Sequence, residues 1–431
     1  LEAPVPVRPG CAFVLVPASV MGARLLDTQV VGADAQFRPV RKQAGRQRRP
    51  RHLGHTAYGL FHFVLAVGVT ALLVSTCGLT FAPLKAPNRP VAPPSNPRGI
   101  VNRFWEWRGC RVRYQALGEE NDGPAILFVH GLFVNADHWR RNLPAAAEAG
   151  FRVFAIDLLG SGYSDKPSPR SEETQAINGE RGRDLGEPEV ELSTSSGDMR
   201  RTAVPLAHPL GSVYNIYTWS EQLCDFAKEV LGASGAVLVG NSIGAVVGLQ
   251  AASDEPQLFG GVLLVNPRFR EEHVAEAPPV VRPFVSLVQG LLRETPVGRW
   301  LFDVIATPSN VKTILKEPYF DASQVTDELV DVLLSPLLSS GAAEVIFDTL
   351  SYSTGPLLEQ QLQDGRISAP IWVCWGERDP WTPPKRVTSL KRFPAVKRVV
   401  GLPDVGHCPH DEAPDPFNSL LIEFASSVRS R

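Results

Sequence analysis

Short apolar runs alternate with stretches of helical periodicity from residue 101 to the end of the chain. Several runs are continuous in valine, isoleucine and leucine, as expected for parallel strands that helices cover on both faces. The pattern predicts an α/β fold with a mostly parallel, eight-stranded sheet flanked by helices. The expected strands are Phe104–Trp107, Val112–Ala116, Ala125–His130, Arg152–Asp157, Ala236–Asn241, Gly261–Asn266, Ile371–Trp375 and Val396–Val400.

One helix start carries a sequence signal of its own. Thr218 is followed three residues later by Glu221. This spacing is typical of a capping box, in which both side chains satisfy backbone amides of the first turn. We therefore expect a helix that begins at Thr218.

Residues 268–360 are apolar with a helical period, yet they lie between two predicted strands. Helices are expected over 281–294, 297–306 and 323–335. An insertion of this size at a strand end predicts a helical cap over a pocket. Its apolar positions favour a substrate with a hydrophobic acyl or alcohol group, and they include Phe284, Val285, Leu287, Val288, Leu291, Leu292, Trp300, Leu301 and Phe302.

A second insertion, residues 168–211, has a different composition. It contains no aromatic residue and mixes both charge signs with serine, proline and glycine. Segments of this kind do not bury enough apolar surface to fold alone. We expect a disordered surface insertion.

The first hundred residues differ from the rest. Residues 1–59 are rich in arginine and poor in acidic residues, the composition of a targeting leader. The apolar segment 60–84 is as long as the about 20 residues that a membrane helix needs, and it is interpreted either as a membrane anchor or as a processing segment. Residues 85–100 are proline-rich and predict a linker. The folded core is expected over 101–267 and 361–431, on either side of residues 268–360.

Charge and cysteine content exclude several classes of protein. The chain carries 43 Lys+Arg and 45 Asp+Glu, a formal net charge of -2. This balance argues against a nucleic-acid-binding protein that relies on a large cationic field. The six cysteines lie far apart without a C-x-x-C pair, so neither a disulfide framework nor a zinc site is predicted. We expect no metal and no organic cofactor.

The candidate nucleophile is Ser242, in the sequence Gly240-Asn241-Ser242-Ile243-Gly244. A G-x-S-x-G pattern between a strand and a helix is typical of a nucleophile elbow, a tight turn that exposes the serine hydroxyl. Gly240 and Gly244 are expected to let the helix pack closely against the strand. The alternative is a buried serine in a glycine-rich turn.

A serine hydroxyl needs an adjacent base. His407 follows the predicted strand near the C-terminus, which suits the chain order of serine, acid and histidine in such folds. His410 is the nearest rival, three residues further on beyond Pro409. We expect His407 to be the base.

The acid that orients the imidazole is expected after the preceding strand, in PIWVCWGERDPWTP. Asp379 lies in a turn there and is the preferred candidate. Glu377 is the alternative but is closer to the strand end. Asp379 could also serve as an Asx-turn residue or a helix cap.

The oxyanion of a tetrahedral intermediate needs preorganised amide donors. A His130-Gly131-Leu132 turn follows an early strand and can supply one of them. We assign the backbone amides of Leu132 and Ile243 to this hole. His130 is expected to brace the loop through hydrogen bonds, and Gly131 to support it.

Together these motifs resemble the α/β-hydrolase superfamily, in the lidded branch with epoxide hydrolases, haloalkane dehalogenases and meta-cleavage product hydrolases. The resemblance covers residues 101–430, about three quarters of the chain. The matching segments are HGLFVNADHW (130–139), DLLGSGYSDKP (157–167), GNSIGAVVGLQAA (240–252), WGERDPWTPP (375–384) and DVGHCPHDEAPD (404–415).

Three segments are similar, more narrowly, to plastid α/β-hydrolases of plants and algae, the group that includes pheophytinase and chlorophyll dephytylase. They are VYNIYTWSEQLCDF, GNSIGAVVGLQAA and ATPSNVKTILKEPYFDASQVTDELVD. This resemblance implies that the basic leader is a plastid-targeting sequence. It also implies a plastid location, with membrane association through 60–84 left open.

The chain departs from the wider branch at the elbow. Epoxide hydrolases and haloalkane dehalogenases use an aspartate there, whereas this chain has Ser242, which argues against both chemistries. The insertion 168–211 has no recognised counterpart. Arg268 follows a strand near the expected cap entrance, where it could bind a substrate carboxylate or form a salt bridge within the cap.

The expected reaction is acyl transfer from a hydrophobic ester to Ser242, with His407 as base and then acid and Asp379 fixing the imidazole. The partner is a small hydrophobic ester, and no nucleic acid is expected. One alternative is carbon–carbon bond hydrolysis of the meta-cleavage type. Another is a catalytically idle, membrane-tethered scaffold. The oligomeric state stays open.

Overall fold

The computed structural model describes residues 99–178, 186–193, 197–232, 234–269, 282–352 and 354–429. All of them belong to one compact unit, Ala82–Arg431. The predicted leader, the apolar segment 60–84 and nearly all of the predicted linker lie outside the described residues.

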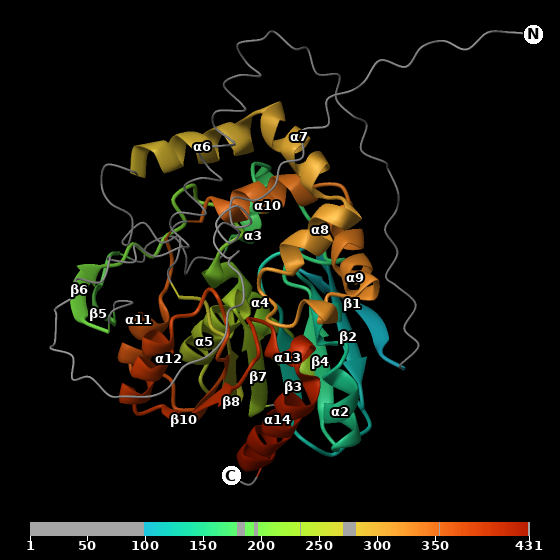
Figure 1. Cartoon of the computed structure of the whole chain (residues 1–431), viewed down its shortest axis with the longest axis vertical. Helices are drawn as coiled ribbons and strands as arrows, with labels where there is room; N and C mark the ends of the chain where they lie inside the picture. The colour runs from blue at the N-terminus through green and yellow to red at the C-terminus, as the bar shows by residue number, and fades with distance from the viewer. Residues whose placement is uncertain are drawn as a thin grey trace, which may run out of the picture. The chain divides into compact units, whose positions relative to one another are not determined.

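The core is an eight-stranded sheet in the order β1-β2-β4-β3-β7-β8-β9-β10 (Figure 1). The β1–β2 and β2–β4 pairs are antiparallel, and every other neighbouring pair is parallel. The predicted α/β fold and its eight strands are confirmed. Their bounds are β1 Val101–Trp107, β2 Cys110–Leu117, β3 Ala125–Val129, β4 Arg152–Ile156, β7 Ala236–Asn241, β8 Phe259–Val265, β9 Ile371–Gly376 and β10 Val396–Leu402.

Helices cover both faces of this sheet. Successive strand residues point to opposite faces, so Leu238 packs in one apolar cluster while Val237 and Val239 pack in the other. The first cluster joins the sheet to α4 (Ile216–Phe226), α5 (Ile243–Asp254), α11 (Leu358–Gln363) and α12 (Pro384–Ser389). The second joins it to α2 (Leu143–Glu148) and α14 (Pro414–Arg429). Burial on both faces explains why the strand runs are continuously apolar.

The start of α4 corrects one prediction. The helix begins at Ile216 and not at Thr218, because the Asn215 side chain accepts hydrogen bonds from the amides of Tyr217 and Thr218. Glu221 does not close a capping box but pairs with Arg108 at 2.7 Å. Asparagine is at least as good an N-cap residue as threonine.

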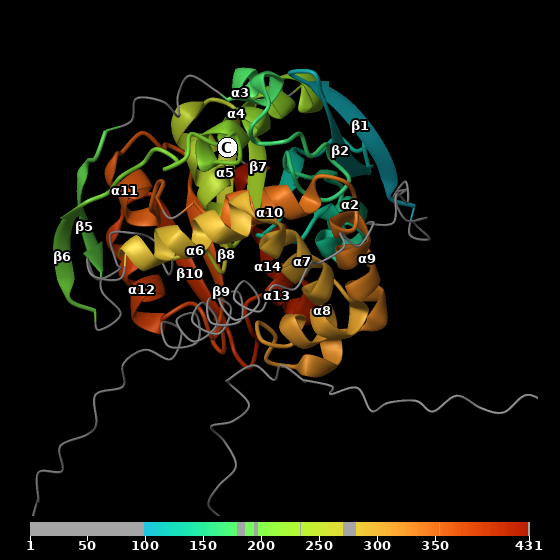
Figure 2. The same cartoon turned by 90° about the horizontal axis from the view of Figure 1, so that it is seen from above.

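In the described part of the chain, five of the α-helices between β8 and β9 form the cap. They are α6 Arg282–Glu294, α7 Pro296–Ile305, α8 Pro308–Leu315, α9 Asp327–Leu337 and α10 Ala342–Leu350. Figure 1 shows α6 and α7 above α10 with the sheet below, and Figure 2 looks down on the same helices. Helices α6, α7 and α9 fall where the periodicity predicts them. Helices α8 and α10 are additional, and α8 begins at a Thr-Pro pair in which Thr307 caps the first turn.

The described parts of the insertion 168–211 correct the prediction of disorder. They contain α3 (Glu172–Ile177) and an antiparallel hairpin of β5 (Glu189–Ser193) and β6 (Met199–Ala203). The hairpin buries an apolar cluster against distant parts of the chain: Val190, Leu192, Val204, Leu206, Tyr217 and Leu357.

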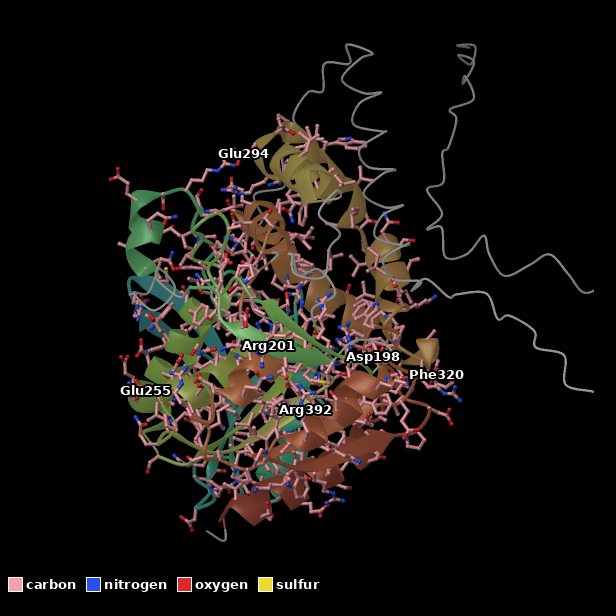
Figure 3. All side chains as sticks on the ribbon, turned by 90° about the vertical axis from the view of Figure 1, so that its left-hand side faces the viewer. Asp198, Arg201, Glu255, Glu294, Phe320 and Arg392 are labelled. Atoms are coloured by element: carbon pink, nitrogen blue, oxygen red, sulfur yellow. The ribbon has the colours of Figure 1, made fainter. Side chains whose placement is uncertain are left out.

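Polar contacts also hold this hairpin to the core. Arg392 donates to the Glu191 carbonyl at 3.1 Å, and Figure 3 shows Arg392 on the same side of the molecule as Arg201 of β6. The insertion therefore folds by using partners that lie far away in sequence.

Among the described residues, no single helix has the length and apolar content to cross a membrane. Only the pair α9 and α10, bent by 96°, passes that test when taken together. Residues such as Leu329 of α9 and Phe347 of α10 are buried within the cap.

Candidate functional site

Ser242 occupies the turn between β7 and α5. Its backbone has φ 55° and ψ −117°, a conformation that non-glycine residues adopt only under strain. A Cβ at Gly240 would collide with the Gly244 carbonyl, and a Cβ at Gly244 would lie 2.5 Å from the His130 carbonyl oxygen. These close approaches require glycine and hold Ser242 at the strand end, as a nucleophile elbow demands.

His407 and Asp379 form a hydrogen-bonded pair. His407 Nδ1 lies 2.7 Å from Asp379 Oδ2. The aspartate comes from the loop after β9 and the histidine from the loop after β10, and these strands are neighbours in the sheet. Both residues are buried, with 9% and 5% of their surface exposed. Because Nδ1 is engaged by the carboxylate, Nε2 is the nitrogen left for chemistry.

Asp379 is held in its ionised form. Its burial acts to raise its pKa, but hydrogen bonds and charge from His407, with hydrogen bonds from Thr382 and Asn266, lower the pKa below its usual value. Its second oxygen, Oδ1, accepts the Trp381 amide at 2.8 Å. A fixed, charged carboxylate orients the imidazole and stabilises its protonated form.

Asn266, just after β8, is a site residue that the sequence reading missed. Its Nδ2 donates to Asp379 Oδ2 at 2.6 Å, while its Oδ1 accepts the Gly376 amide at 3.1 Å. Its φ of 39° is also in the left-handed region. The only sequence signal was a polar residue at the end of an apolar strand, and its partners lie more than a hundred residues away.

The serine turn and the histidine loop are tied through Asn241. The Asn241 side chain donates to the backbone carbonyls of His407, at 3.3 Å, and Val265, at 3.2 Å. The Trp381 ring packs edge-on against the His407 ring, with 4.8 Å between centroids. Since β7, β8, β9 and β10 lie side by side, their C-terminal ends gather Ser242, Asn266, Asp379 and His407 at one edge of the sheet.

The turn after β3 reaches the same edge. A Cβ built on Gly131 would lie 3.5 Å from Ser242 Cβ, so this turn packs directly on the serine. Ile243 is the first residue of α5, where helical amides have no partner within the helix. In the described portion of the chain, neither the Ile243 nor the Leu132 amide donates to a backbone carbonyl outside regular elements. The assignment of these two amides to an oxyanion hole stays a prediction.

His130 braces this turn. Its Nδ1 lies 2.7 Å from the Gly131 carbonyl, and its Nε2 accepts the Leu158 amide at 3.1 Å. Burial lowers the pKa of His130, which keeps the ring neutral. Both ring nitrogens of His130 are thus engaged by this turn and by Leu158, and its supporting role stays a prediction.

The rival residues lie elsewhere. His410 is fully buried, its Nε2 lies 3.2 Å from His138 Nδ1, and its ring packs on Trp139. Burial holds the pKa of His410 well below its usual value, so it is a poor base. Glu377 is exposed and Asp379 is the carboxylate that contacts His407. The Arg268 amide donates to the Ser242 carbonyl at 3.2 Å, which places this arginine beside the elbow.

Among the described residues, no group of three or more histidine, cysteine, aspartate or glutamate side chains is arranged to hold a metal ion. The residues gathered at the sheet edge instead comprise a strained serine, a carboxylate-bound imidazole and two backbone amides. This set can perform nucleophilic acyl transfer with its own groups.

Comparisons with known proteins identify a family and several relatives. A family model described as the alpha/beta hydrolase family matches residues 126–420. The chain is 28% identical over 348 residues to the chloroplastic pheophytinase of Arabidopsis thaliana, a match that covers 77% of this chain and 67% of that protein. It is 25% identical over 327 residues to a 2-hydroxy-6-oxononadienedioate/2-hydroxy-6-oxononatrienedioate hydrolase of Comamonas testosteroni, covering 72% and 91% of the two chains.

Solved structures share the fold at lower sequence identity. A bacterial membrane phospholipase A superposes with a TM-score of 0.53 at 21% identity, covering 87% of this chain and all of the other. A serine hydrolase involved in carbazole degradation superposes with a TM-score of 0.52 at 18% identity, covering 76% of this chain and all of the other. These likenesses support the architecture of the sheet and its flanking helices.

Proposed function

Because the chain belongs to the alpha/beta hydrolase family, and is thus an enzyme that acts on a small-molecule substrate, we propose that it cleaves a carboxylic ester with Ser242 as nucleophile. His407 is the general base and then the general acid, and Asp379 holds the imidazole. The amides of Leu132 and Ile243 bind the oxyanion. The observation that carries the proposal is the 2.7 Å contact between His407 and Asp379, beside a serine held in a strained strand-to-helix turn.

The proposed reaction has two halves. Ser242 Oγ attacks the ester carbonyl carbon while His407 Nε2 takes the hydroxyl proton, and the carbonyl oxygen becomes an oxyanion facing the two amides. Collapse breaks the bond to the alcohol, which leaves with the proton from His407. Water, deprotonated by His407, then releases the acid from the acyl-enzyme and restores the Ser242 hydroxyl.

The cap and the relatives support one substrate class. Phe302 and Phe347 form part of an apolar cluster in the cap, which suits an ester with a hydrophobic acyl or alcohol group. Similarity to the chloroplastic pheophytinase favours a long-chain, phytyl-type ester and a plastid location. The basic composition of residues 1–59 supports the same compartment, and the apolar run 60–84 supports membrane association.

The test compares full-length wild type with Ser242→Ala on a panel of short-chain, long-chain and phytyl esters. Loss of more than about a thousandfold in kcat is expected, because the nucleophile has no substitute. Ser253→Ala is the matched control, since it makes the same change at a buried serine of α5, the helix that follows Ser242. Retention of more than a tenth of wild-type turnover in Ser242→Ala would contradict the proposal.

Carbon–carbon bond hydrolysis is the second candidate, favoured by the 25% identity to the Comamonas testosteroni hydrolase over 91% of its length. The same Ser242, His407 and Asp379 would serve it. Assaying the wild type on a vinylogous 1,5-diketone acid beside the ester panel separates the two. A kcat/KM for the diketone above that for every ester would favour the second candidate.

A further inference from the structure

The loop that carries His407 runs against one segment of the cap. The His407 amide donates to the Pro318 carbonyl at 2.7 Å. A Cβ at Gly406 would collide with this same carbonyl oxygen, so the two backbones are in direct contact. The cap segment, residues 318–321, lies between α8 and α9. The backbone of the proposed general base therefore rests on the cap as well as on the core.

Glu412 accepts hydrogen bonds from both backbones of this contact. Its Oε2 accepts the Gly406 amide at 2.8 Å, and its Oε1 accepts the Asp321 amide at 2.7 Å. The Phe320 amide also contributes. One carboxylate thus joins the residue before His407 to the cap segment 318–321, and only 8% of Glu412 is exposed. A carboxylate suits this task because both of its oxygens accept hydrogen bonds.

The cap segment itself is anchored to the core beneath it. The Tyr319 hydroxyl donates to Asp411 Oδ2 at 2.8 Å and lies 3.0 Å from His138 Nε2. Asp411 is fully buried and pairs with Arg140 at 2.7 Å. Because Tyr319 is held by buried polar groups, residues 318–321 are a fixed support against which the His407 loop can be placed.

We propose that Glu412 is a positioning residue for His407, in that its carboxylate clamps the His407 loop to the cap segment 318–321. This inference rests on the proposed role of His407 as general base. Asp379 and Asn241 hold the ring and the carbonyl of His407, whereas Glu412 fixes the backbone from which the ring projects. A misplacement of a catalytic group by about 1 Å costs on the order of a hundredfold in rate. Glu412 therefore acts on the chemical step and not on substrate binding.

The experiment uses full-length Glu412→Gln. Glutamine keeps the size of the side chain but has one acceptor oxygen. At least one of the backbone amides that donate to Glu412 therefore loses its acceptor and meets an NH₂ donor. We expect the rate of fluorophosphonate labelling and the kcat for a reactive ester to fall by about 10- to 100-fold, with KM within about twofold of wild type. A merely structural role would not produce this split between kcat and KM.

Two control variants isolate the clamp. Glu423→Gln makes the same substitution on α14, where Glu423 is exposed and pairs with Arg398. Asp321→Asn removes the charge of an exposed side chain at the clamp, keeps an oxygen that can accept the Ser323 amide, and leaves the Asp321 backbone amide in place to donate to Glu412. Both variants are expected to label at the wild-type rate.

The outcomes separate this inference from the proposed function. An unlabelled wild type contradicts the proposed function itself. Normal labelling of wild type, together with wild-type rate and kcat in Glu412→Gln, overturns the role of Glu412 alone. If Glu412→Gln does not fold, Gly406→Ala is tested in its place, because the added Cβ would displace the His407 loop from Pro318. Slow labelling with unchanged KM then supports the clamp, and a wild-type rate overturns it.

Discussion

The two halves of the cap are held in different ways. The α8–α9 half shares an apolar cluster with the core, in which Tyr319 and Leu329 pack with Cys408, the residue after His407. In the described residues, the apolar cluster of the α6–α7 half contains cap residues alone, among them Phe302 and Phe347. The first half therefore packs against the edge of the sheet that gathers Ser242, Asp379 and His407, called the catalytic edge below. The second half is packed mainly on itself.

Polar contacts repeat this difference. The α8–α9 half is joined to the core by Tyr319 and by the Glu412 clamp, next to His407. The α6–α7 half is joined through Asp348 of α10, which pairs with Arg293 of α6 at 3.0 Å and accepts the Ser212 hydroxyl. Ser212 precedes α4 and belongs to no part of the catalytic edge. The α8–α9 half thus contacts the His407 loop directly, whereas the α6–α7 half reaches the core at Ser212.

Asp411 and Asp348 give the largest expected effects. Both are fully buried and paired with an arginine, so replacing either with alanine removes a buried carboxylate from beside that cation. Asp411→Ala is expected to lower the free energy of unfolding by about 3–5 kcal/mol, and Asp348→Ala by less, because Arg293 is partly exposed. Chemical denaturation measures this loss.

The two aspartate variants must also differ in catalysis. At a temperature where each is folded, only Asp411→Ala should label slowly with a fluorophosphonate, since only Asp411 supports the segment beside His407. Equal labelling rates in the two variants would break the comparison between the cap halves.

His138 predicts a pH dependence of stability. Burial lowers its pKa to about 4 in the folded protein, against an unfolded value near 6.5. The unfolded chain thus binds a proton at higher pH than the folded one, so the stabilisation is complete above pH 6.5 and is lost as pH falls toward 4. The loss is about 3 kcal/mol. Urea unfolding at several pH values should show that the free energy of unfolding depends less steeply on pH in His138→Gln than in wild type. An unchanged pH dependence would contradict this assignment.

Asn266 tests the core side of the catalytic edge. Asn266→Ala removes the donor that lies 2.6 Å from Asp379 Oδ2. The carboxylate is then oriented less firmly, and it loses one of the hydrogen bonds that lower its pKa. We expect kcat to fall about 10- to 100-fold, with the acid limb of the pH profile moved to higher pH. The control is Asn418→Ala, which removes an amide side chain from α14. Equal kcat in the two variants would remove Asn266 from the site.

Leu287 gives the smallest expected effect. It lies on α6, in the cap half that is packed on itself, and 69% of it is exposed. Leu287→Ser should change the free energy of unfolding by less than about 0.5 kcal/mol and leave kcat on a short-chain ester unchanged. A kcat change beyond about twofold on that ester would show that the α6–α7 half does reach the chemistry.

Local patterns predicted much of this molecule. The strands could be read from continuous apolar runs, since each strand is buried by helices on both faces. Ser242 was indicated by glycines that a tight turn needs, and Asp379 and His407 by their places after successive strands. That these three act together stays a prediction, although the structure brings His407 and Asp379 to 2.7 Å.

Long-range contacts explain what the sequence did not reveal. The hairpin within 168–211 looked polar, but Val190 and Leu192 pack on Tyr217 and Leu357, which a local window does not include. Asn266 and Glu412 find their partners across loops, which no local spacing in the sequence predicts. The helix start at Ile216 was missed because Asn215 caps it in place of Thr218.

The central claim is that Ser242 is an activated nucleophile. Full-length protein treated with a fluorophosphonate and mapped by peptide mass spectrometry tests it most directly. We expect one adduct per chain, on Ser242, and an adduct rate reduced more than about a hundredfold in His407→Ala. A folded wild type that stays unlabelled, or an adduct on another residue, would contradict the account and favour a catalytically idle fold.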